Sequence, residues 1–130
     1  MLRSLLIIGC GLFWLAAAPA VRAVDPDARA VYTRFLKSWE TGDEKTFAAC
    51  LHPKVVFKYP GGVLNRDELI ATFKAYQTEK KDIKIYLADF FVSDGRRHRT
   101  AYQFAATDRA TGKRFAVGTG VAGEVADGLI

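Results

Sequence analysis

The sequence predicts an α+β fold in which three helices pack on one face of an antiparallel sheet. After an apolar N-terminal stretch, apolar residues recur at helical spacing through the first half of the chain. From residue 83 onward, long β-rich segments alternate with short turns that contain glycine. Helices that come first and a meander of long strands that follows are typical of a sheet covered by helices on one face.

The first 23 residues have the composition of a cleavable signal peptide. Arg3 precedes an apolar run from Leu5 to Ala18, and small residues follow at Ala18-Pro19-Ala20 and Val21-Arg22-Ala23. The run is shorter than the roughly 20 residues that a membrane-spanning helix needs. We therefore expect export to the periplasm or the medium after cleavage at Ala20 or Ala23, with Ala23 favoured. The mature chain is then expected to have no stable membrane association.

Residues 24–130 have the length of one domain and leave no room for two. Loss of Arg3 and Arg22 with the signal lowers the formal net charge from +5 to +3, because 17 basic and 14 acidic residues remain. The basic cluster Arg96-Arg97-His98-Arg99 follows a predicted turn, where a charge run is usually solvated. The modest charge and the expected export argue against a nucleic-acid partner.

The sequence contains no pattern that requires a metal ion, an organic cofactor or a disulfide. Cys50 is the one cysteine left after cleavage, and its apolar helical surroundings predict a small buried side chain. No His, Cys, Asp or Glu spacing fits a metal site. Gly118-Thr119-Gly120 lacks the strand, turn and helix of a dinucleotide-binding loop. We expect no cofactor.

The helices follow from apolar spacing and from capping residues. One face of a helix over 27–39 is formed by apolar residues at Val31, Tyr32, Phe35, Leu36 and Trp39. Gly42 suits the left-handed residue after a helix end, and Asp43 can cap a second helix that runs to about residue 51. Asn65 is predicted to cap a third helix that ends near residue 79.

The strands are bounded by proline and glycine. Residues 55–59 lie between Pro53 and Pro60-Gly61-Gly62 and are rich in β-branched and aromatic side chains, which predicts a short strand. Three longer strands are predicted over 83–92, 98–107 and 114–125, with turns at Asp94-Gly95 and Ala110-Thr111-Gly112. Because two residues follow Asp127-Gly128, we expect a final returning strand to be truncated.

The order of these segments resembles the SnoaL-like branch of the nuclear transport factor 2-like superfamily, to which ketosteroid isomerases and polyketide cyclases belong. The segments that carry the resemblance are the run from Val31 to Trp39, Thr41-Gly42-Asp43, the run from Leu51 to Phe57, Pro60-Gly61-Gly62 and Asp127-Gly128. The resemblance implies a cone-shaped curved antiparallel sheet wrapped on three N-terminal helices, with an apolar pocket between them. It also implies chemistry without a cofactor and a homodimer formed through the outer face of the sheet.

The residues that ketosteroid isomerases use are missing at the matching positions. Those enzymes place a tyrosine in the first helix, an aspartate base at the end of the first strand and a protonated aspartic acid on a late strand. The corresponding positions here are Phe35, Tyr59 and Val121. We therefore expect no steroid isomerisation by that set of groups.

Three other residues are candidate catalytic groups. Asp89 lies in an apolar predicted strand, and an apolar environment would raise the pKa of its carboxyl group and suit it to acid–base catalysis. The alternative for Asp89 is a bulge or an outward-facing position. Tyr59 is expected at the pocket mouth. His98 belongs to the basic rim, unless the strand face that it shares with Tyr102 looks inward.

The sequence leaves two functions and a third alternative, which is a dimerising interaction module with a filled core and no cavity. The first is binding of a small apolar ligand by an aromatic lining, which consists of Tyr32, Phe35, Trp39, Phe57, Tyr59, Phe73 and Tyr102. The second is a cofactor-free isomerase, cyclase or dehydratase. It would use Asp89 or His98 as a base and Tyr59 or Tyr102 as a hydrogen-bond donor. The absent isomerase residues favour binding.

Overall fold

Three helices occupy the first half of the described chain, which covers residues 26–94 and 97–130 of a computed structural model. α1 spans Pro26–Thr41, α2 spans Glu44–Ala49 and α3 spans Arg66–Glu79. The three predicted helices are thus confirmed. The predicted signal peptide lies outside the described residues, and no helix within them is long and apolar enough to cross a membrane.

Polar caps fix where α2 and α3 begin. The carboxylate of Asp43 accepts hydrogen bonds from the Thr46 backbone N–H at 3.0 Å and from the Thr46 hydroxyl at 2.6 Å. The Asn65 side chain accepts from the Glu68 N–H at 3.0 Å, and the Glu68 carboxylate accepts from the Asn65 N–H at 2.8 Å. These bonds satisfy amide groups that a helix start leaves without an intrahelical partner.

A two-stranded hairpin separates α2 from α3. β1 spans Phe57–Tyr59 and pairs antiparallel with β2, Gly62–Leu64. The predicted strand at 55–59 therefore begins two residues later, and the sequence analysis missed its partner strand. Gly62 has a φ of 150°, a conformation that favours glycine and lets the chain reverse directly after Pro60-Gly61.

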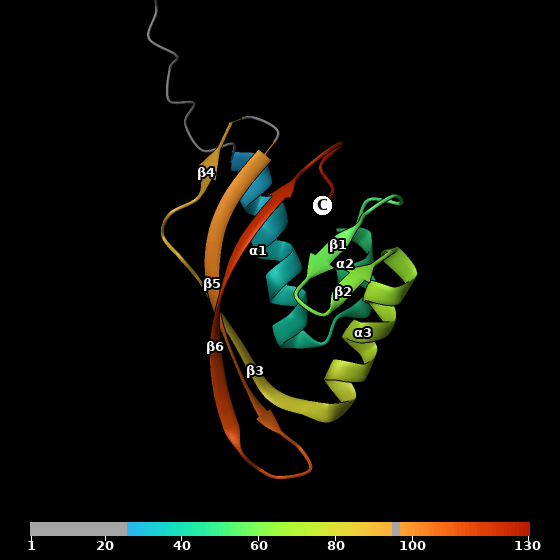
Figure 1. The fold of residues 1–130 in the computed structure, drawn as a ribbon, viewed down its shortest axis with the longest axis vertical. Coiled ribbons are helices and arrows are strands. Elements are labelled where there is room, and N and C mark those ends of the chain that lie inside the picture. The colour runs from blue at the N-terminus through green and yellow to red at the C-terminus, as the bar shows by residue number, and fades with distance from the viewer. Residues whose placement is uncertain (1–25, 95–96) are drawn as a thin grey trace, which may run out of the picture.

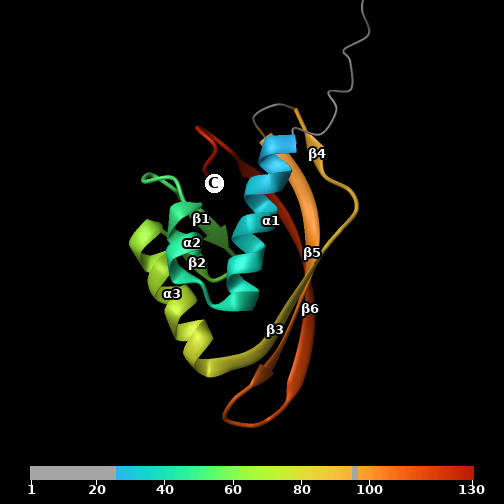
Figure 2. The same cartoon turned by 180° about the vertical axis from the view of Figure 1, so that it is seen from behind.

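The main sheet is antiparallel and curved. β5, Arg97–Asp108, pairs with β3, Lys80–Leu87, and β4, Val92–Ser93, on one side and with β6, Arg114–Glu124, on the other. Figure 1 shows this sheet bending around one side of the helices, and Figure 2 shows α1 lying between the sheet and the other two helices. The predicted α+β fold, with a curved sheet wrapped on N-terminal helices, is confirmed. It forms no closed barrel.

The strand predicted over 83–92 is confirmed as far as Leu87 and is wrong beyond it, because the chain leaves the regular ladder there. The Phe90 carbonyl accepts a hydrogen bond from the Thr100 hydroxyl at 2.9 Å, and Phe91 turns inward until it is 3% exposed. A short β4 then resumes the pairing with β5. Burial of Phe91 therefore replaces the regular ladder at this place.

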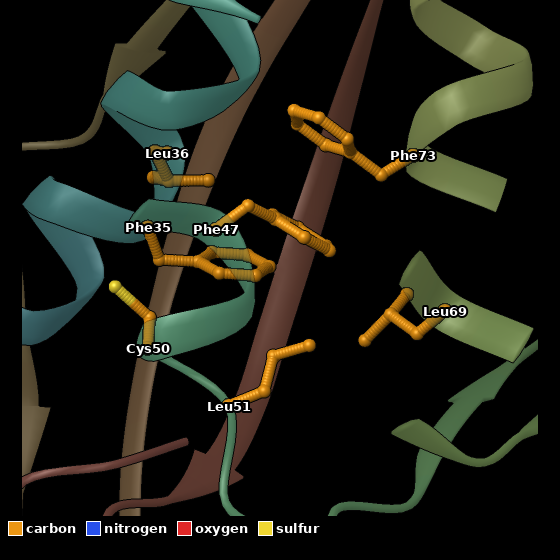
Figure 3. Close-up of a cluster of buried hydrophobic side chains, with 7 residues drawn as sticks. All are labelled: Phe35, Leu36, Phe47, Cys50, Leu51, Leu69 and Phe73. Carbon is orange, nitrogen blue, oxygen red and sulfur yellow. The ribbon is translucent and has the colours of Figure 1, made fainter. Parts of the chain in front are cut away.

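The main hydrophobic core joins the three helices, as Figure 3 shows. The Phe47 ring stacks on Phe73 with ring centres 4.2 Å apart and on Phe35 with centres 5.1 Å apart. Cys50 is fully buried beside them as a free thiol, which confirms the predicted burial of this side chain. A smaller cluster of Ala28, Tyr32 and Phe91 lies between the start of α1 and β4.

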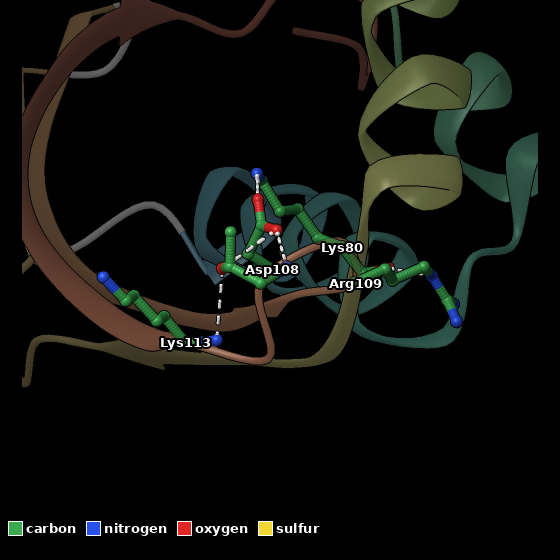
Figure 4. Close-up of polar contacts among 5 residues, drawn as sticks. Lys80, Asp108, Arg109 and Lys113 are labelled. Atoms are coloured by element: carbon green, nitrogen blue, oxygen red, sulfur yellow. Dashed lines mark hydrogen bonds and ion pairs between the residues drawn. The ribbon is translucent and has the colours of Figure 1, made fainter.

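A polar joint holds the start of β3 against the turn between β5 and β6 (Figure 4). The Lys80 ammonium lies 2.7 Å from the Asp108 carboxylate, whose other oxygen accepts from the Thr111 N–H at 2.9 Å. The Arg109 side chain donates to the Lys80 carbonyl at 2.9 Å. This joint closes the end of the sheet that is next to α3.

The end of the chain returns to α2. After Asp127 and Gly128, which have φ values of 53° and 71°, an isolated bridge pairs Ala126 with Leu129. The Ile130 N–H then donates to the Cys50 carbonyl at 2.9 Å, and the Ile130 carbonyl accepts from the His52 N–H at 2.7 Å. After this turn, the described chain therefore forms one bridge and a contact with the helical layer.

Candidate functional site: an aromatic cavity

A cavity of about 330 Å³ lies between the helices, the hairpin and the inner face of the sheet. The helices contribute Phe35, Leu36, Trp39, Leu69, Thr72 and Tyr76, and the hairpin contributes Phe57, Tyr59 and Leu64. The sheet contributes Ile85, Tyr102, Phe104, Val117 and Thr119. This cavity is inconsistent with the alternative of a filled core.

Helix and strand periodicities bring these side chains together. Phe35 and Trp39 lie one turn apart on α1, so both project from the same face of the helix. Tyr102 and Phe104 alternate with outward-facing neighbours on β5. The β5–β6 register places Thr119 opposite Tyr102 and Val117 opposite Phe104, so that these pairs share the inner face of the sheet.

The polar groups of the cavity are all neutral. They are the hydroxyl groups of three tyrosines and two threonines and the indole N–H of Trp39. No aspartate, glutamate, histidine, lysine or arginine is among the described lining residues. Burial raises the pKa of Tyr102, and the nearby Tyr76 raises it further. Burial also raises the pKa of Tyr76. At neutral pH both phenols therefore stay protonated and able to donate a hydrogen bond.

Five of the seven predicted lining residues do line the cavity: Phe35, Trp39, Phe57, Tyr59 and Tyr102. The other two lie elsewhere. Phe73 is 1% exposed within the main core, where it stacks on Phe47. Tyr32 packs edge-on against Phe91 in the smaller cluster, with ring centres 5.9 Å apart.

The candidate catalytic residues are not brought together. Tyr59 lines the cavity. Asp89 is exposed in the segment between β3 and β4, and its backbone carbonyl accepts a hydrogen bond from Arg29 at 3.2 Å. The outward-facing alternative for Asp89 is therefore the one that the structure has, and the candidate catalytic role in the apolar interior is corrected: because the chain has left the sheet, the side chain has no inner face to occupy.

His98 is buried on β5 but is not among the residues that line the cavity. It is 1% exposed, which corrects its predicted place on a solvated rim. Its ring lies 4.3 Å from that of Tyr32 and stacks on Phe91 at 5.4 Å. Neither ring nitrogen has a hydrogen-bond partner among the described residues. Burial lowers the pKa of His98, and the negative charge of Glu124 acts in the opposite direction.

Several lining residues were not singled out from the sequence. Val117 and Thr119 belong to the alternating series Phe115, Val117, Thr119 and Val121, which marks one face of the strand and is the signal that could have identified them. Their inward direction depends on the register with β5, which local spacing does not fix. Among the described residues, no group of three or more His, Cys, Asp or Glu is placed to hold a metal ion.

Comparison with known proteins defines the family. The model of the SnoaL-like domain matches residues 32–130. The chain belongs to the SnoaL-like domain family. The resemblance that the sequence analysis noted is therefore confirmed. A comparison with curated proteins finds no match.

Solved structures similar to this SnoaL-like domain share its fold at low sequence identity. TsrD from Streptomyces laurentii is 22% identical over 82% of this chain and 84% of its own, with a TM-score of 0.70. An LEH-like epoxide hydrolase from M. tuberculosis is 18% identical over 79% of this chain and 76% of its own, with a TM-score of 0.69. A putative polyketide cyclase from Xanthomonas campestris pv. campestris is 17% identical over 79% of this chain and 84% of its own, with a TM-score of 0.62.

Proposed function

We propose that this SnoaL-like domain binds a small, uncharged and mainly apolar molecule in its aromatic cavity. The observation that carries the proposal is a cavity of about 330 Å³ whose described lining is aromatic and aliphatic and contains neutral polar groups only. Ligand sites of this kind are mostly apolar, with a few polar groups that orient the ligand. The volume suits a molecule of one to three rings.

The absence of charge in the described lining argues for an uncharged ligand. A charged group that enters an apolar cavity loses its hydration, and here it would gain no ionic partner from the lining. The tyrosine hydroxyls can instead donate to a carbonyl, ether or hydroxyl oxygen. We therefore expect the ligand to carry at least one neutral oxygen acceptor.

A cofactor-free isomerase, cyclase or dehydratase is the alternative, and the geometry favours it less. Such a reaction needs a base within hydrogen-bond reach of the substrate. Tyr59, Tyr76 and Tyr102 could donate, but Asp89 is exposed and His98 does not line the cavity. Binding requires only the groups that the lining contains.

The proposal is tested with two probes that differ in charge. N-phenyl-1-naphthylamine is neutral, and 8-anilino-1-naphthalenesulfonate has the same ring skeleton with an added sulfonate. We expect the neutral probe to bind at least about tenfold more tightly, which corresponds to about 1.4 kcal/mol. Fluorescence titration of the purified protein measures both affinities. Equal affinities would contradict an uncharged site.

A pair of α3 variants links the binding to the cavity. Thr72 lines it and Thr78 does not, yet both side chains are exposed and both hydroxyls donate to the carbonyl four residues earlier, at 2.8 Å and 3.1 Å. Thr72→Phe places a ring in the cavity, so neutral-probe affinity should fall at least about tenfold. Thr78→Phe should leave it unchanged. If both substitutions changed the affinity of the neutral probe equally, the probe would bind outside the cavity.

We also propose that the domain acts after export. The proposal rests on the signal-like composition of residues 1–23 and on nothing in the fold. Native mass spectrometry of protein collected outside the cytoplasm tests it, and the same spectrum reveals any retained small molecule. A mature chain that begins at Val24 is expected. Full-length protein confined to the cytoplasm would refute export without bearing on ligand binding.

A further inference from the structure

Three rings that line the cavity pack together as an aromatic wall, formed by Trp39, Tyr76 and Phe104. The centre of the Tyr76 ring lies 5.8 Å from that of Trp39 and 5.4 Å from that of Phe104, and both contacts are edge-on. Aromatic pairs prefer such arrangements. Because the Tyr76 ring is held on two sides, the position of its hydroxyl oxygen is fixed.

A lysine outside the lining lies against the aromatic wall. The Lys80 ammonium is 5.9 Å from the centre of the Tyr76 ring and 5.7 Å from that of Phe115, which packs on Phe104 at 6.4 Å. Neither Lys80 nor Phe115 lines the cavity. A cation at this distance is attracted by the electrons of an aromatic ring. The aromatic wall therefore has a positive charge on its far side, although the described lining has none.

The Lys80 ammonium is held in this position. It lies 2.7 Å from the Asp108 carboxylate (Figure 4), and its side chain is 17% exposed. The next residue, Lys81, is exposed. The Asp108 carboxylate offsets part of the charge of Lys80, but a partly buried charge is screened less by water and salt than an exposed one. Lys80 can therefore act on the aromatic wall in a way that Lys81 cannot.

The charge of Lys80 distinguishes Tyr76 from Tyr102. Burial raises the pKa of both phenols. At Tyr76 the Lys80 ammonium opposes this effect, while the Glu79 carboxylate adds to it; at Tyr102 the further cause is the nearby Tyr76, which also raises the pKa. A cation near a phenol polarises its O–H bond and strengthens it as a hydrogen-bond donor. Of these two phenols in the lining, Tyr76 is the one that Lys80 strengthens.

We propose that Lys80 is a positioning residue of the cavity, which through Tyr76 selects a ligand with a terminal carbonyl oxygen and holds that oxygen at the aromatic wall. This inference rests on the proposed binding function and narrows its ligand class. A carbonyl oxygen has two lone pairs, so it can accept from Tyr76 and Tyr102 together, and it has no proton that would need an acceptor. An anionic ligand would need the ammonium itself, which the aromatic wall separates from the cavity.

Two neutral probes distinguish this inference from the proposed function. The ketone 6-propionyl-2-dimethylaminonaphthalene fluoresces at longer wavelength when its carbonyl oxygen accepts a hydrogen bond. N-phenyl-1-naphthylamine contains no oxygen. We expect both to bind, the ketone with long-wavelength emission. If neither bound, the binding function and this inference would both fail. If N-phenyl-1-naphthylamine alone bound, the carbonyl preference would be wrong and the binding function would stand.

Removal of the charge tests the role of Lys80. Lys80→Met keeps a long unbranched side chain, so emission of the bound ketone should shift to shorter wavelength and its affinity should fall about two- to fivefold. That loss should exceed any loss for N-phenyl-1-naphthylamine. Lys80→Arg keeps the charge and should keep the long-wavelength emission, and Lys81→Met should change neither probe. Unchanged emission in Lys80→Met, or equal losses for the two probes, would overturn the positioning role.

Two phenylalanine variants test the donor and remain informative if Lys80→Met fails to fold. Tyr76→Phe keeps the ring in the aromatic wall and removes the hydroxyl group. Emission of the bound ketone should shift to shorter wavelength, and its affinity should fall about two- to tenfold. Tyr102→Phe should have a smaller effect on both, because Lys80 does not strengthen that phenol. An effect of Tyr102→Phe equal to or larger than that of Tyr76→Phe would overturn the proposal.

Discussion

At the scale of single residues, His98 has an unusual environment: its buried imidazole lies among aromatic rings. Buried polar groups almost always have a hydrogen-bond partner, because an unpaired one loses its contact with water. Neither ring nitrogen of His98 has a hydrogen-bond partner in the part of the chain that the structure describes, and the aromatic rings of Tyr32 and Phe91 lie against it. The ring contributes as an apolar side chain as long as it stays neutral.

This environment predicts a loss of stability at mildly acidic pH. The pKa of His98 is lowered by burial, whereas a histidine in the unfolded chain takes up its proton near pH 6.5. Below that pH the unfolded state binds more protons than the folded state, so the free energy of unfolding falls as the pH falls. The loss ends once the pH passes the lowered pKa of the folded state.

His98→Phe keeps a ring in this place and removes the titrating group. Urea denaturation of both proteins between pH 8 and pH 5 measures the effect. We expect the wild type to lose stability relative to His98→Phe as the pH drops below about 6.5. A difference between the two proteins that stays constant over this range would contradict the prediction.

At the scale of elements, the joint between β3 and the β5–β6 turn has its own pH dependence. The pKa of Asp108 is lowered to about 2, first by the hydrogen bond from Lys80 and then by that from the Thr111 N–H. A carboxyl group with a lowered pKa stabilises the fold above its unfolded value of about 3.9. That contribution is lost as the pH falls through about 2.

Asp108→Asn removes this carboxylate at nearly constant size. We expect the variant to be less stable than the wild type at pH 7, with a difference that shrinks between about pH 4 and pH 2. Thermal unfolding across that range measures it. Asp89→Asn is the matched control: that carboxylate is exposed, so the substitution should change stability little. If the stability difference between Asp108→Asn and the wild type stayed constant over this pH range, protonation of Asp108 would not be the cause of the pH dependence.

The helices and the two longest strands could be predicted because their signals are local. Apolar residues three and four apart locate α1, and Asp43 and Asn65 mark the starts of the next two helices. The break after Leu87 could not be predicted in this way. It depends on Phe91 packing against Tyr32, which lies far away in the sequence, and against His98 of β5.

The residues that line the cavity could likewise be predicted only where local spacing identifies them. Phe35, Trp39 and Tyr102 line it as their spacing indicates, whereas Tyr32, on the same face of α1, packs against Phe91 and against His98 of β5 instead. The apolar face of a helix shows that a residue is buried but not which neighbour buries it. The expected role of Asp89 required a strand that continued to residue 92, and it failed where that strand ends.

At the scale of the whole molecule, two hydrophobic clusters hold the helices to the sheet. The larger joins α1, α2 and α3, and the smaller joins the start of α1 to Phe91 and the end of β6. Ile130 is partly buried and packs against both. Its backbone is bonded to Cys50 and His52, so the end of the described chain links the helical layer to the sheet.

Ile130→Ala tests this link, because it removes the side chain and keeps both backbone hydrogen bonds. We expect the free energy of unfolding to fall by about 1–3 kcal/mol, less than for a fully buried isoleucine. Leu129→Ala is the control, since Leu129 is also partly buried but belongs to neither cluster. Urea denaturation measures both. If Ile130 couples the two layers, amide hydrogen exchange should accelerate in α2 and around Phe91 together. Acceleration in one of them alone would show that the clusters are stabilised independently of this residue.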